Sequence, residues 1–299
     1  MTTMENPRDC RRERSTFAGA VTLVIACFLV FSASASASIV DMLGPAGDFA
    51  ILGINGATIN LSSGPLQIDG NVGVADNSQL NFSGGGQIDG RVDYSSSATL
   101  NTGGNTITGG THAVNFNPIT QAVQNMVNFA NSLSSTQAFD SITSAMTLTS
   151  TGPQNVISIA HDIHLSGGSL TLSGSASDVF IFKISGTMEL SGDTQILLTG
   201  GLTANNVLWD FIGSGSQVQT SGKSETAGIF LAPLRDININ GGFHDSEFIS
   251  GTRLSFQSNP VVAQPVPEVT PSWVIFAFLG LVVALSWRPE LIRRIWATL

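Results

Sequence analysis

A short phrase that returns about every twenty residues constrains this chain more than any other feature. The tetrapeptide Gln-Ile-Asp-Gly occupies residues 67–70 and 87–90, and a looser copy, Thr-Ile-Thr-Gly, occupies residues 106–109. An apolar piece precedes each copy, at residues 58–61, 79–82 and 99–101. One such unit cannot bury its own apolar side chains, so the units must stack on one another. The repeat therefore predicts a mainly β chain folded as a parallel β-solenoid, which offers long flat faces rather than a catalytic pocket.

The later half of the chain carries strand signals of the same kind with another phrase. Short runs of branched and aromatic residues lie between glycines and asparagines, a pattern typical of strands joined by tight turns. An x-Leu-Ser-Gly ending recurs at residues 164–167, 171–174 and 189–192. We therefore expect two groups of rungs, a rung being one coil of the solenoid: residues 38–116 and residues 136–262.

Residues 117–135 interrupt the repeat with a helical pattern. Asn117 suits the N-cap position and the proline that follows it suits the first helical turn. Apolar residues then recur every three or four positions, at Ile119, Val123, Met126, Ala130 and Leu133. We expect a helix with one apolar stripe to lie along the side of the solenoid. A helix that binds a partner protein is the alternative.

The first 37 residues have the pattern of a secretory signal peptide. Four arginines precede an apolar run over residues 17–31, and Ser-Ala alternation follows. This order predicts cleavage after Ala37, with Ala35 and Ala37 as the small residues of the site. A lipoprotein signal at Cys27 is the alternative, although the apolar run continues past that cysteine. The pattern predicts export of the chain across the inner membrane, to the cell surface or beyond.

The C-terminal end has the pattern of a sorting signal. Residues 263–271 form a proline-rich linker that contains Pro267 and Glu268, and residues 272–287 carry no charge. Arg293 and Arg294 lie in the basic tail that follows, which predicts a transmembrane segment with its tail in the cytoplasm. This order resembles the PEP-CTERM signal that exosortase systems recognise, except that Val269 replaces the second proline of the motif. The resemblance implies a processing protease as a partner, and a plain membrane anchor is the alternative.

The net charge of the residues between these two ends argues against nucleic acid as a partner. Residues 38–267 hold five basic and sixteen acidic residues, a net charge of −11. Such a surface repels the phosphate backbone, so we expect no nucleic-acid binding. Both cysteines, Cys10 and Cys27, lie in the predicted signal peptide, so we expect no disulfide in the exported part.

Three short segments resemble those of two groups of exported bacterial solenoid proteins. Residues 43–53, 206–211 and 228–233 are similar to the opening and closing segments of the choice-of-anchor A putative adhesins and of the DUF3494 ice-binding proteins. Both resemblances imply a right-handed β-solenoid with a long helix alongside. The Leu-Ala-Pro sequence at residues 231–233 and the sorting tail favour the first group. That resemblance implies an adhesive surface or matrix protein, whose ligand is a polysaccharide or another surface molecule. Ice binding is the alternative function.

A regular row of threonines is the pattern that would indicate ice binding. Thr106 and Thr108, and likewise Thr147 and Thr149, have the two-residue spacing that places both side chains on one face of a strand. We retain these four as a possible binding face. The pattern does not recur on successive rungs, because the two Gln-Ile-Asp-Gly copies place glutamine and aspartate at the positions that match Thr106 and Thr108.

The remaining polar residues predict no catalytic, cofactor or metal site. Asp69 and Asp89 are expected on neighbouring rungs, where calcium binding is the alternative to a role in turns. His161 and His164 should point to opposite sides of a strand. Residues 244–247, His-Asp-Ser-Glu, hold residue types used in catalysis, but neighbours along a chain rarely form a triad. We therefore predict that the chain is not an enzyme, and a polysaccharide-active solenoid enzyme is the distant alternative.

Overall fold

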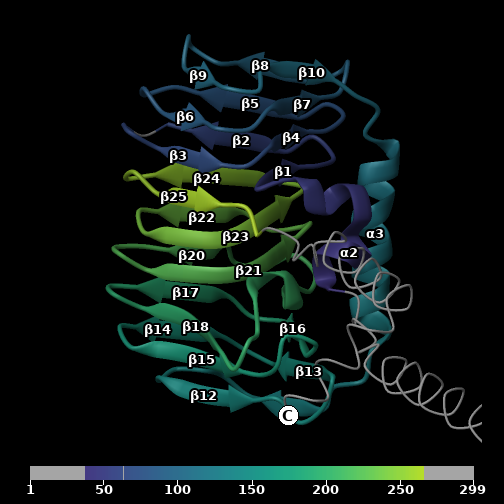
Figure 1. Ribbon diagram of the computed structural model, residues 1–299, viewed down its shortest axis with the longest axis vertical. Helices are drawn as coiled ribbons and strands as arrows, with labels where there is room; N and C mark the ends of the chain where they lie inside the picture. The colour runs from purple at the N-terminus through teal and green to yellow at the C-terminus, as the bar shows by residue number, and fades with distance from the viewer. Residues whose placement is uncertain (1–37, 63, 266–299) are drawn as a thin grey trace, which may run out of the picture. The chain divides into compact units, whose positions relative to one another are not determined.

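The computed structural model describes residues 38–62 and 64–265. In this part of the chain the strands coil into a stack of rungs, and neighbouring strands run parallel (Figure 1). The predicted mainly β class and the parallel β-solenoid are thus confirmed. Each typical rung contributes one strand to each of three faces, which we name by what covers or lines them.

The helix-covered face consists of β11 (Gln137–Phe139), β13 (Gln154–Ile159), β16 (Val179–Ile184), β19 (Val207–Phe211), the second halves of β21 (Glu225–Ala232) and β23 (Phe243–Ser250), β1 (Ile51–Gly53), β4 (Val72–Val74), β7 (Val92–Tyr94) and β10 (Thr111–Ala113). The amide face consists of β14 (Ile163–Ser166), β17 (Met188–Ser191), β20 (Val218–Thr220), β22 (Ile237–Asn240), β24 (Arg253–Gln257), β2 (Thr58–Leu61), β5 (Gln79–Phe82) and β8 (Thr99–Asn101). The mixed face consists of β12 (Met146–Thr149), β15 (Ser169–Ser173), β18 (Gln195–Thr199), the first halves of β21 and β23, β25 (Val261–Ala263), β3 (Gln67–Asp69), β6 (Gln87–Ile88) and β9 (Thr106–Ile107). Strands β21 and β23 bend around the corner that the mixed and helix-covered faces share.

The order of the rungs in space differs from their order in the sequence. The chain enters in the middle of the stack at β1 and builds rungs towards β10 at one end (Figure 1). After α3 it continues from β11 at the other end and builds rungs back towards the middle, where β23, β24 and β25 pair with β1, β2 and β3. The two repeat-bearing segments are therefore joined into one stack, with the last rung of the second segment on the first rung of the first.

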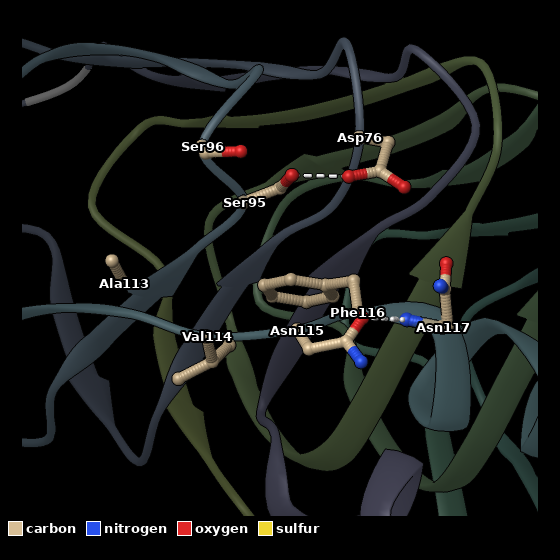
Figure 2. A pocket seen from close by; sticks show the side chains of 8 residues that line it. All are labelled: Asp76, Ser95, Ser96, Ala113, Val114, Asn115, Phe116 and Asn117. Carbon is tan, nitrogen blue, oxygen red and sulfur yellow. Dashed lines mark hydrogen bonds between the residues drawn. The ribbon is translucent and has the colours of Figure 1, made fainter.

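Helix α3 (Asn117–Ser132) begins and ends slightly differently from the prediction. Asn117 is not the N-cap: Phe116 precedes the helix without a side-chain cap, and the Asn115 side chain accepts a hydrogen bond from the Asn117 N–H at 3.1 Å (Figure 2). The helix ends at Ser132 rather than at residue 135, because Leu133 is extended. The sequence pattern also does not predict α2 (Ile39–Leu43), whose first turn is closed by a capping box between Ser38 and Asp41. Two short 3₁₀ helices, η1 (Gly44–Asp48) and η2 (Ala204–Asn206), complete the elements.

The predicted apolar stripe of α3 packs on the solenoid, as expected. Ile119, Val123, Met126 and Ala130 are buried in a second core, which α2 and η1 also enter. Outward side chains of the helix-covered face form the other side of this core, namely Leu52, Ile181, Leu208, Ile229, Leu231 and Ile249. Lys183 Nζ donates to the Leu133 carbonyl at 3.0 Å, at the negative end of the helix dipole. The helix and its lysine contact therefore cover the middle of one of the three faces, whereas β10 at its end stays exposed.

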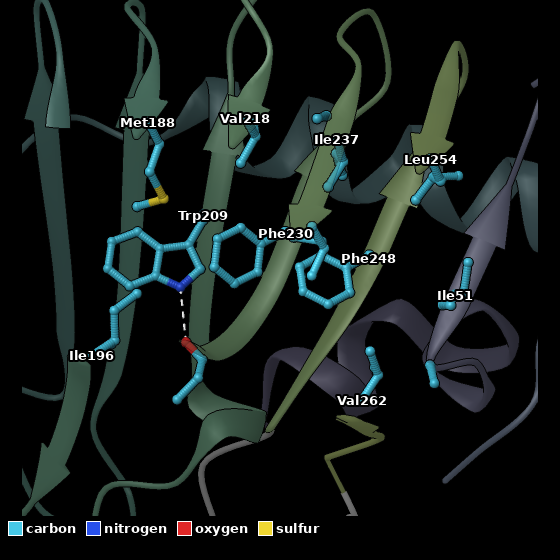
Figure 3. Close-up of a cluster of buried hydrophobic side chains, with 14 of the residues drawn as sticks. Ile51, Met188, Ile196, Trp209, Val218, Phe230, Ile237, Phe248, Leu254 and Val262 are labelled. Atoms are coloured by element: carbon cyan, nitrogen blue, oxygen red, sulfur yellow. Dashed lines mark hydrogen bonds between the residues drawn. The ribbon is translucent and has the colours of Figure 1, made fainter. Parts of the chain in front are cut away.

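The main core lies inside the coil and holds the aromatic residues that the sequence places at alternate strand positions. Trp209 stacks on Phe182 at a ring-centroid distance of 4.1 Å and on Phe230 at 5.9 Å (Figure 3). The indole N–H donates to the Ala227 carbonyl at 2.9 Å. Gly228 makes this approach possible, because a Cβ there would lie 2.8 Å from the indole nitrogen. These contacts place the aromatic residues in the core rather than on the surface.

Several predictions concern residues outside the described part of the chain. These are the signal cleavage site at Ala35 and Ala37, the sorting motif at Pro267 and Glu268, the transmembrane segment, and the arginines Arg293 and Arg294. They remain predictions. Within residues 38–62 and 64–265, no helix combines the length and the apolar composition needed to cross a bilayer.

Candidate functional site

Two of the three faces are open, and their exposed side chains are set by strand alternation. Inward positions carry the apolar core, so every second residue of a strand points outward. Outward side chains on neighbouring rungs lie side by side, since the strands are parallel and in register. Each open face is therefore a grid with steps of about 4.8 Å between rungs and about 7 Å along a strand. The two open faces differ in the chemical nature of these outward side chains.

The amide face is an unbroken sheet of eight strands, and its central row is almost entirely polar and uncharged. The registers of the strands define this row from one end of the stack to the other: His164, Glu189, Gln219, Asn238, Ser255, Asn60, Asn81 and Asn101. The ionisable side chains of the row lie at one end, where His164 Nδ1 and Glu189 Oε2 are 3.2 Å apart. From β20 to β8 the central row carries no ionisable side chain.

Three asparagines of this row form a hydrogen-bonded ladder along the stack. Asn81 Nδ2 donates to Asn60 Oδ1 at 3.0 Å, and Asn101 Nδ2 donates to Asn81 Oδ1 at 2.9 Å. Gln79 Nε2 also donates to Asn81 Oδ1, at 2.7 Å. These bonds hold the amides in one orientation before any ligand arrives. A fixed grid of donors and acceptors loses little conformational entropy when it binds.

Hydroxyl groups flank the asparagine ladder on both sides. Thr58 and Thr99 lie in the row before it, and Ser62 and Ser83 continue the strands after it. The row before the ladder also contains Arg253, which is paired with Asp236 at 2.5 Å between Nη2 and Oδ2. The amide face can therefore order water through amides and hydroxyls, with one neutralised ion pair among them.

A buried arginine supports the corner behind the amide face. Arg235 is 2% exposed and donates to the carbonyls of Gly213 at 2.9 Å, of Ser185 at 2.8 Å and of Ile212 at 2.5 Å, and also to that of Gly186. These carbonyls lie in the turns that lead into β17 and β20, and Arg235 itself precedes β22. One guanidinium group thus fixes the entry of three consecutive strands into the amide face.

The mixed face contains all four threonines of the predicted binding face, at its two ends. Thr106 and Thr108 lie on β9 and directly after it, whereas Thr147 and Thr149 lie on β12. Strands β9 and β12 are separated by eight strand steps, about 38 Å. Within one chain the four threonines therefore do not form a single patch.

The middle of the mixed face is irregular. Leu197 and Phe243 are 38% and 48% exposed there, and Glu225 lies between them. Towards β9 the Gln-Ile-Asp-Gly repeats place Asp69 and Asp89 on the surface, in register as predicted. Apolar and charged groups thus alternate along this face, and no row of one chemistry runs its length.

The two aspartates of the Gln-Ile-Asp-Gly repeats accept hydrogen bonds from glutamines on their own rung. Gln67 Nε2 donates to Asp69 Oδ1 at 2.8 Å, and Gln87 makes the same contact with Asp89. The hydrogen bond from Gln87 lowers the pKa of the exposed Asp89 carboxyl. In the part of the chain that the structure describes, no group of three or more histidine, cysteine, aspartate or glutamate side chains could hold a metal ion. The calcium alternative therefore finds no ligand set here.

Of the two neighbouring histidines only His164 lies on a strand, because β14 begins after His161, and each histidine has its own partner. His161 contacts Asp140 at 2.9 Å in a turn, whereas His164 contacts Glu189 on the amide face. His244 is buried and bonded to Thr226 and to the Gly241 carbonyl, and burial lowers its pKa to about 4.

The tetrapeptide at residues 244–247 does not form a triad. His244 and Ser246 alternate with Asp245 and Glu247 along β23, so the two pairs point to opposite sides of the strand. A polar cleft at the start of α3 is lined by Asp76, Ser95 and six neighbours, and Ser95 donates to Asp76 (Figure 2). Its lining contains neither a histidine nor a cation, so the Asp76 carboxylate is the ionisable group of this cleft.

Comparison with known proteins identifies the group to which these features correspond. The family model described as "Ice-binding-like" matches residues 54–259. An ice-binding protein from Flavobacterium frigoris is 38% identical over 52 residues, which cover 17% of this chain and 19% of that protein. An ice-binding protein from Flammulina populicola is 29% identical over 97 residues, covering 32% and 38% of the two chains. The matched stretches thus span well under half of these relatives.

Solved structures show the same fold. An ice-binding protein from the Antarctic ascomycete Antarctomyces psychrotrophicus aligns with a TM-score of 0.53 at 23% identity, over 75% of this chain and 98% of its own. An ice-binding protein from an Antarctic Flavobacteriaceae bacterium aligns with a TM-score of 0.55 at 25% identity, over 76% and 48%.

These findings contradict the prediction of an adhesive surface protein that binds matrix or polysaccharide. The family model and the relatives favour the alternative, and they agree with a binding protein rather than an enzyme. The prediction was wrong because it used the tail of the chain to choose between two groups with one scaffold. The prediction also did not single out the asparagines at residues 60, 81 and 101, although they recur in the apolar pieces before each repeat.

Proposed function

The chain belongs to the Ice-binding-like family, and from this premise we propose that it binds ice through the amide face. The observation that carries the proposal is the ladder of Asn60, Asn81 and Asn101, held by hydrogen bonds across three rungs of an open, unbroken sheet. The helix-covered face is closed by α3, and the mixed face is interrupted by carboxylates and exposed apolar side chains.

The physical basis of the proposal is the fixed spacing of groups that bind water. Ice is a lattice of hydrogen-bonded water, so a protein that binds it must present many donors and acceptors at regular intervals and in one orientation. Ordered water that bridges such groups is nearly as favourable as a direct hydrogen bond. The rungs set the spacing in one direction and the strand alternation sets it in the other. Carboxylates hold a strong hydration shell of their own, and the central row from β20 to β8 contains none.

The proposal is tested by one substitution on each open face of the same rung. Asn81→Asp on β5 replaces an amide of the ladder with a carboxylate, which cannot donate to Asn60. Gln87→Glu on β6 makes the same chemical change on the mixed face. We expect thermal hysteresis and recrystallisation inhibition of the full chain to fall strongly in Asn81→Asp and to remain in Gln87→Glu.

Two results would contradict different parts of the proposal. Absence of both activities in the unsubstituted chain would contradict ice binding itself. An equal loss in both variants, or a loss in Gln87→Glu alone, would contradict the assignment to the amide face. Circular dichroism of both variants establishes that the solenoid is still folded.

We also propose that the chain acts outside the cytoplasm. Support comes from the signal pattern that ends at Ala37 and from the absence of cysteine in residues 38–265. Mass spectrometry of the exported protein would show whether cleavage follows Ala37 and whether the segment after Pro267 and Glu268 is removed.

A further inference from the structure

Both ends of the stack are open among the residues that the structure describes. At one end β8, β9 and β10 pair only with β5, β6 and β7. At the other end β12 pairs with β15 and β11 with β13, while Ile142 bridges to Ile163. The outer edges of these strands present backbone N–H and C=O groups, and such edges can pair with another chain.

The main core is also incompletely covered at these two ends. Ile107 and Leu100 are partly exposed at one end, whereas Ile88, the register partner of Ile107 on the next rung, is fully buried. At the other end Phe139 and Met146 are partly exposed in the same way. Each end thus presents a layer of apolar side chains framed by free strand edges.

The end strands lack the features that usually protect an edge. Natural sheets place charges, prolines or bulges on edge strands to prevent association. Strands β8 to β10 contain no aspartate, glutamate, lysine, arginine or proline, and β11 and β12 contain none either. Acidic residues at the end of β11 and β12 lie outside the strands: Asp140 directly follows β11, and the Asp162 carbonyl accepts a hydrogen bond from the Ile142 N–H. Because the end strands themselves carry no charge, one end of the stack does not repel the opposite end of a second copy.

The chain already contains one junction of the required kind. The rung of β23, β24 and β25 pairs with the rung of β1, β2 and β3, although almost 200 residues separate them in the sequence. All three faces continue across this junction in parallel register. Two rungs without a direct chain connection can therefore complete each other's sheets in this fold.

We propose that a second copy of this chain stacks end to end on the first, with β12 and β11 of one copy beside β9 and β10 of the next. The parallel direction and the three faces then continue from copy to copy. Such an interface joins two different ends, so it is heterologous and can extend into a row. The association does not rest on ice binding, although it would lengthen every face, including the amide face.

The same stacking would bring the separated threonines of the mixed face together. One row of register partners runs along this face from Thr147 through Thr171 to Asp89, beside which Thr108 lies. In a stacked pair, Thr108 of one copy therefore lies beside Thr147 of the next. A hydroxyl patch that neither end has alone forms across the junction.

Substitutions at the two ends provide a complementation test. Ile107→Lys places a charge in the apolar layer of one end, and Phe139→Lys does so at the other. Gln67→Lys is the matched control, because it adds the same charge to the row of Thr106 on the mixed face, but on β3, two rungs away from the edge strand β9. Sedimentation velocity and small-angle X-ray scattering of the full chain, above freezing and over a range of concentrations, measure the association.

We expect the unsubstituted chain and Gln67→Lys to form species that lengthen while their cross-section stays constant. Each end variant alone should associate at least about tenfold more weakly. An equal mixture of Ile107→Lys and Phe139→Lys should form one-to-one pairs, since one intact end of each kind remains. This recovery also shows that neither variant has simply unfolded.

Three results would overturn the proposal. The first is a chain that stays monomeric at every concentration. The second is association that neither end variant weakens, as expected for side-by-side contact through Leu197 and Phe243. The third is a mixture of the two end variants that fails to pair.

Discussion

In one and the same rung, β5 presents Gln79 and Asn81 to solvent, while β6 presents Gln87 and Asp89. The backbone spacing of these two strands is the same, and their outward residues differ only in that the second is an asparagine in the first case and an aspartate in the other. The hydrogen bonds, however, run in different directions. On the amide face Asn81 also bonds to the rungs on either side, whereas on the mixed face Gln87 bonds within its own rung.

This difference is the basis on which we propose one repeat of the sequence, and not the other, for the binding face. Bonds along the stack join Asn60, Asn81 and Asn101 into one ladder of identical side chains. On the mixed face the bonds between rungs are isolated pairs of unlike side chains, such as Thr108 with Asp89. Carboxylates at Asp69 and Asp89 add a second distinction, because they are charged and separately hydrated. The most conspicuous motif of the sequence, Gln-Ile-Asp-Gly, therefore forms part of the scaffold. The apolar piece before each copy, which carries an asparagine, forms the proposed binding face.

The largest expected effect on the comparison of the two faces is the loss of stability when the buried arginine behind the amide face is replaced. Arg235→Met would leave four backbone carbonyls without their donors. We expect the free energy of unfolding to fall by about 3 to 5 kcal/mol, with the first loss of amide-exchange protection in β17, β20 and β22. Urea unfolding and hydrogen exchange measure both effects.

Lys223→Met is the control for this substitution, because Lys223 is exposed and carries the same charge. We expect its effect to stay within about 0.5 kcal/mol. If Arg235→Met were equally mild, the guanidinium would not be the support of this corner.

The fold could be predicted from the sequence as far as local patterns reach. The twenty-residue phrase, the strand alternation and the stripe from Ile119 to Ala130 each describe a short stretch of chain, and the structure contains all three. The junction of β24 with β2 could not be predicted, because it joins residues almost 200 positions apart and no local pattern records such a pairing. Helix α2 was missed because five residues are too few to show a period.

The candidate site was harder to predict than the fold. The two-residue spacing of the threonines correctly predicted that Thr106 and Thr108 point outward on one face. It could not show that Thr147 and Thr149 lie at the far end of that face, since the reversed order of the rungs is a tertiary feature. The asparagines at residues 60, 81 and 101 were visible as a repeat, but only the ladder geometry shows that they bond to one another.

The next prediction concerns the pH dependence of stability, which arises from a buried carboxyl and not from the side chains of the two open faces. Asp210 lies on the helix-covered face in register with Lys183, and burial raises its pKa to about 7 against the opposing charges of Lys183 and Arg235. The folded chain therefore keeps a proton that the unfolded chain has released above its ordinary pKa of 3.8. Stability from this group is present at low pH and is lost as the pH rises from about 4 to about 7.

Asp210→Asn removes this dependence, so the difference between variant and unsubstituted chain isolates the one carboxyl. We expect the variant to gain nothing near pH 4 and up to about 4 kcal/mol above pH 7. Subtraction also cancels His244, whose lowered pKa acts in the opposite sense as the pH falls from about 6.5 to about 4. A constant difference across the range would show that Asp210 is ionised throughout. Ice activity should stay constant over the same range, because the central row of the amide face from β20 to β8 has no ionisable side chain.

The smallest expected effect concerns the one charged side chain near the asparagine ladder. Arg253 lies in register with Thr58 and is paired with Asp236, and it is more than half exposed. An exposed ion pair contributes about 0 to 1 kcal/mol, so Arg253→Gln should cost no more than that in urea unfolding. It would replace a cation with an amide in the row that contains Thr58 and Gln79, and we therefore expect thermal hysteresis to rise slightly. A fall as large as that of Asn81→Asp would mean that a charge at this grid point contributes to binding. The distinction between the two faces would then lie in the sign and pairing of their charges rather than in an uncharged grid.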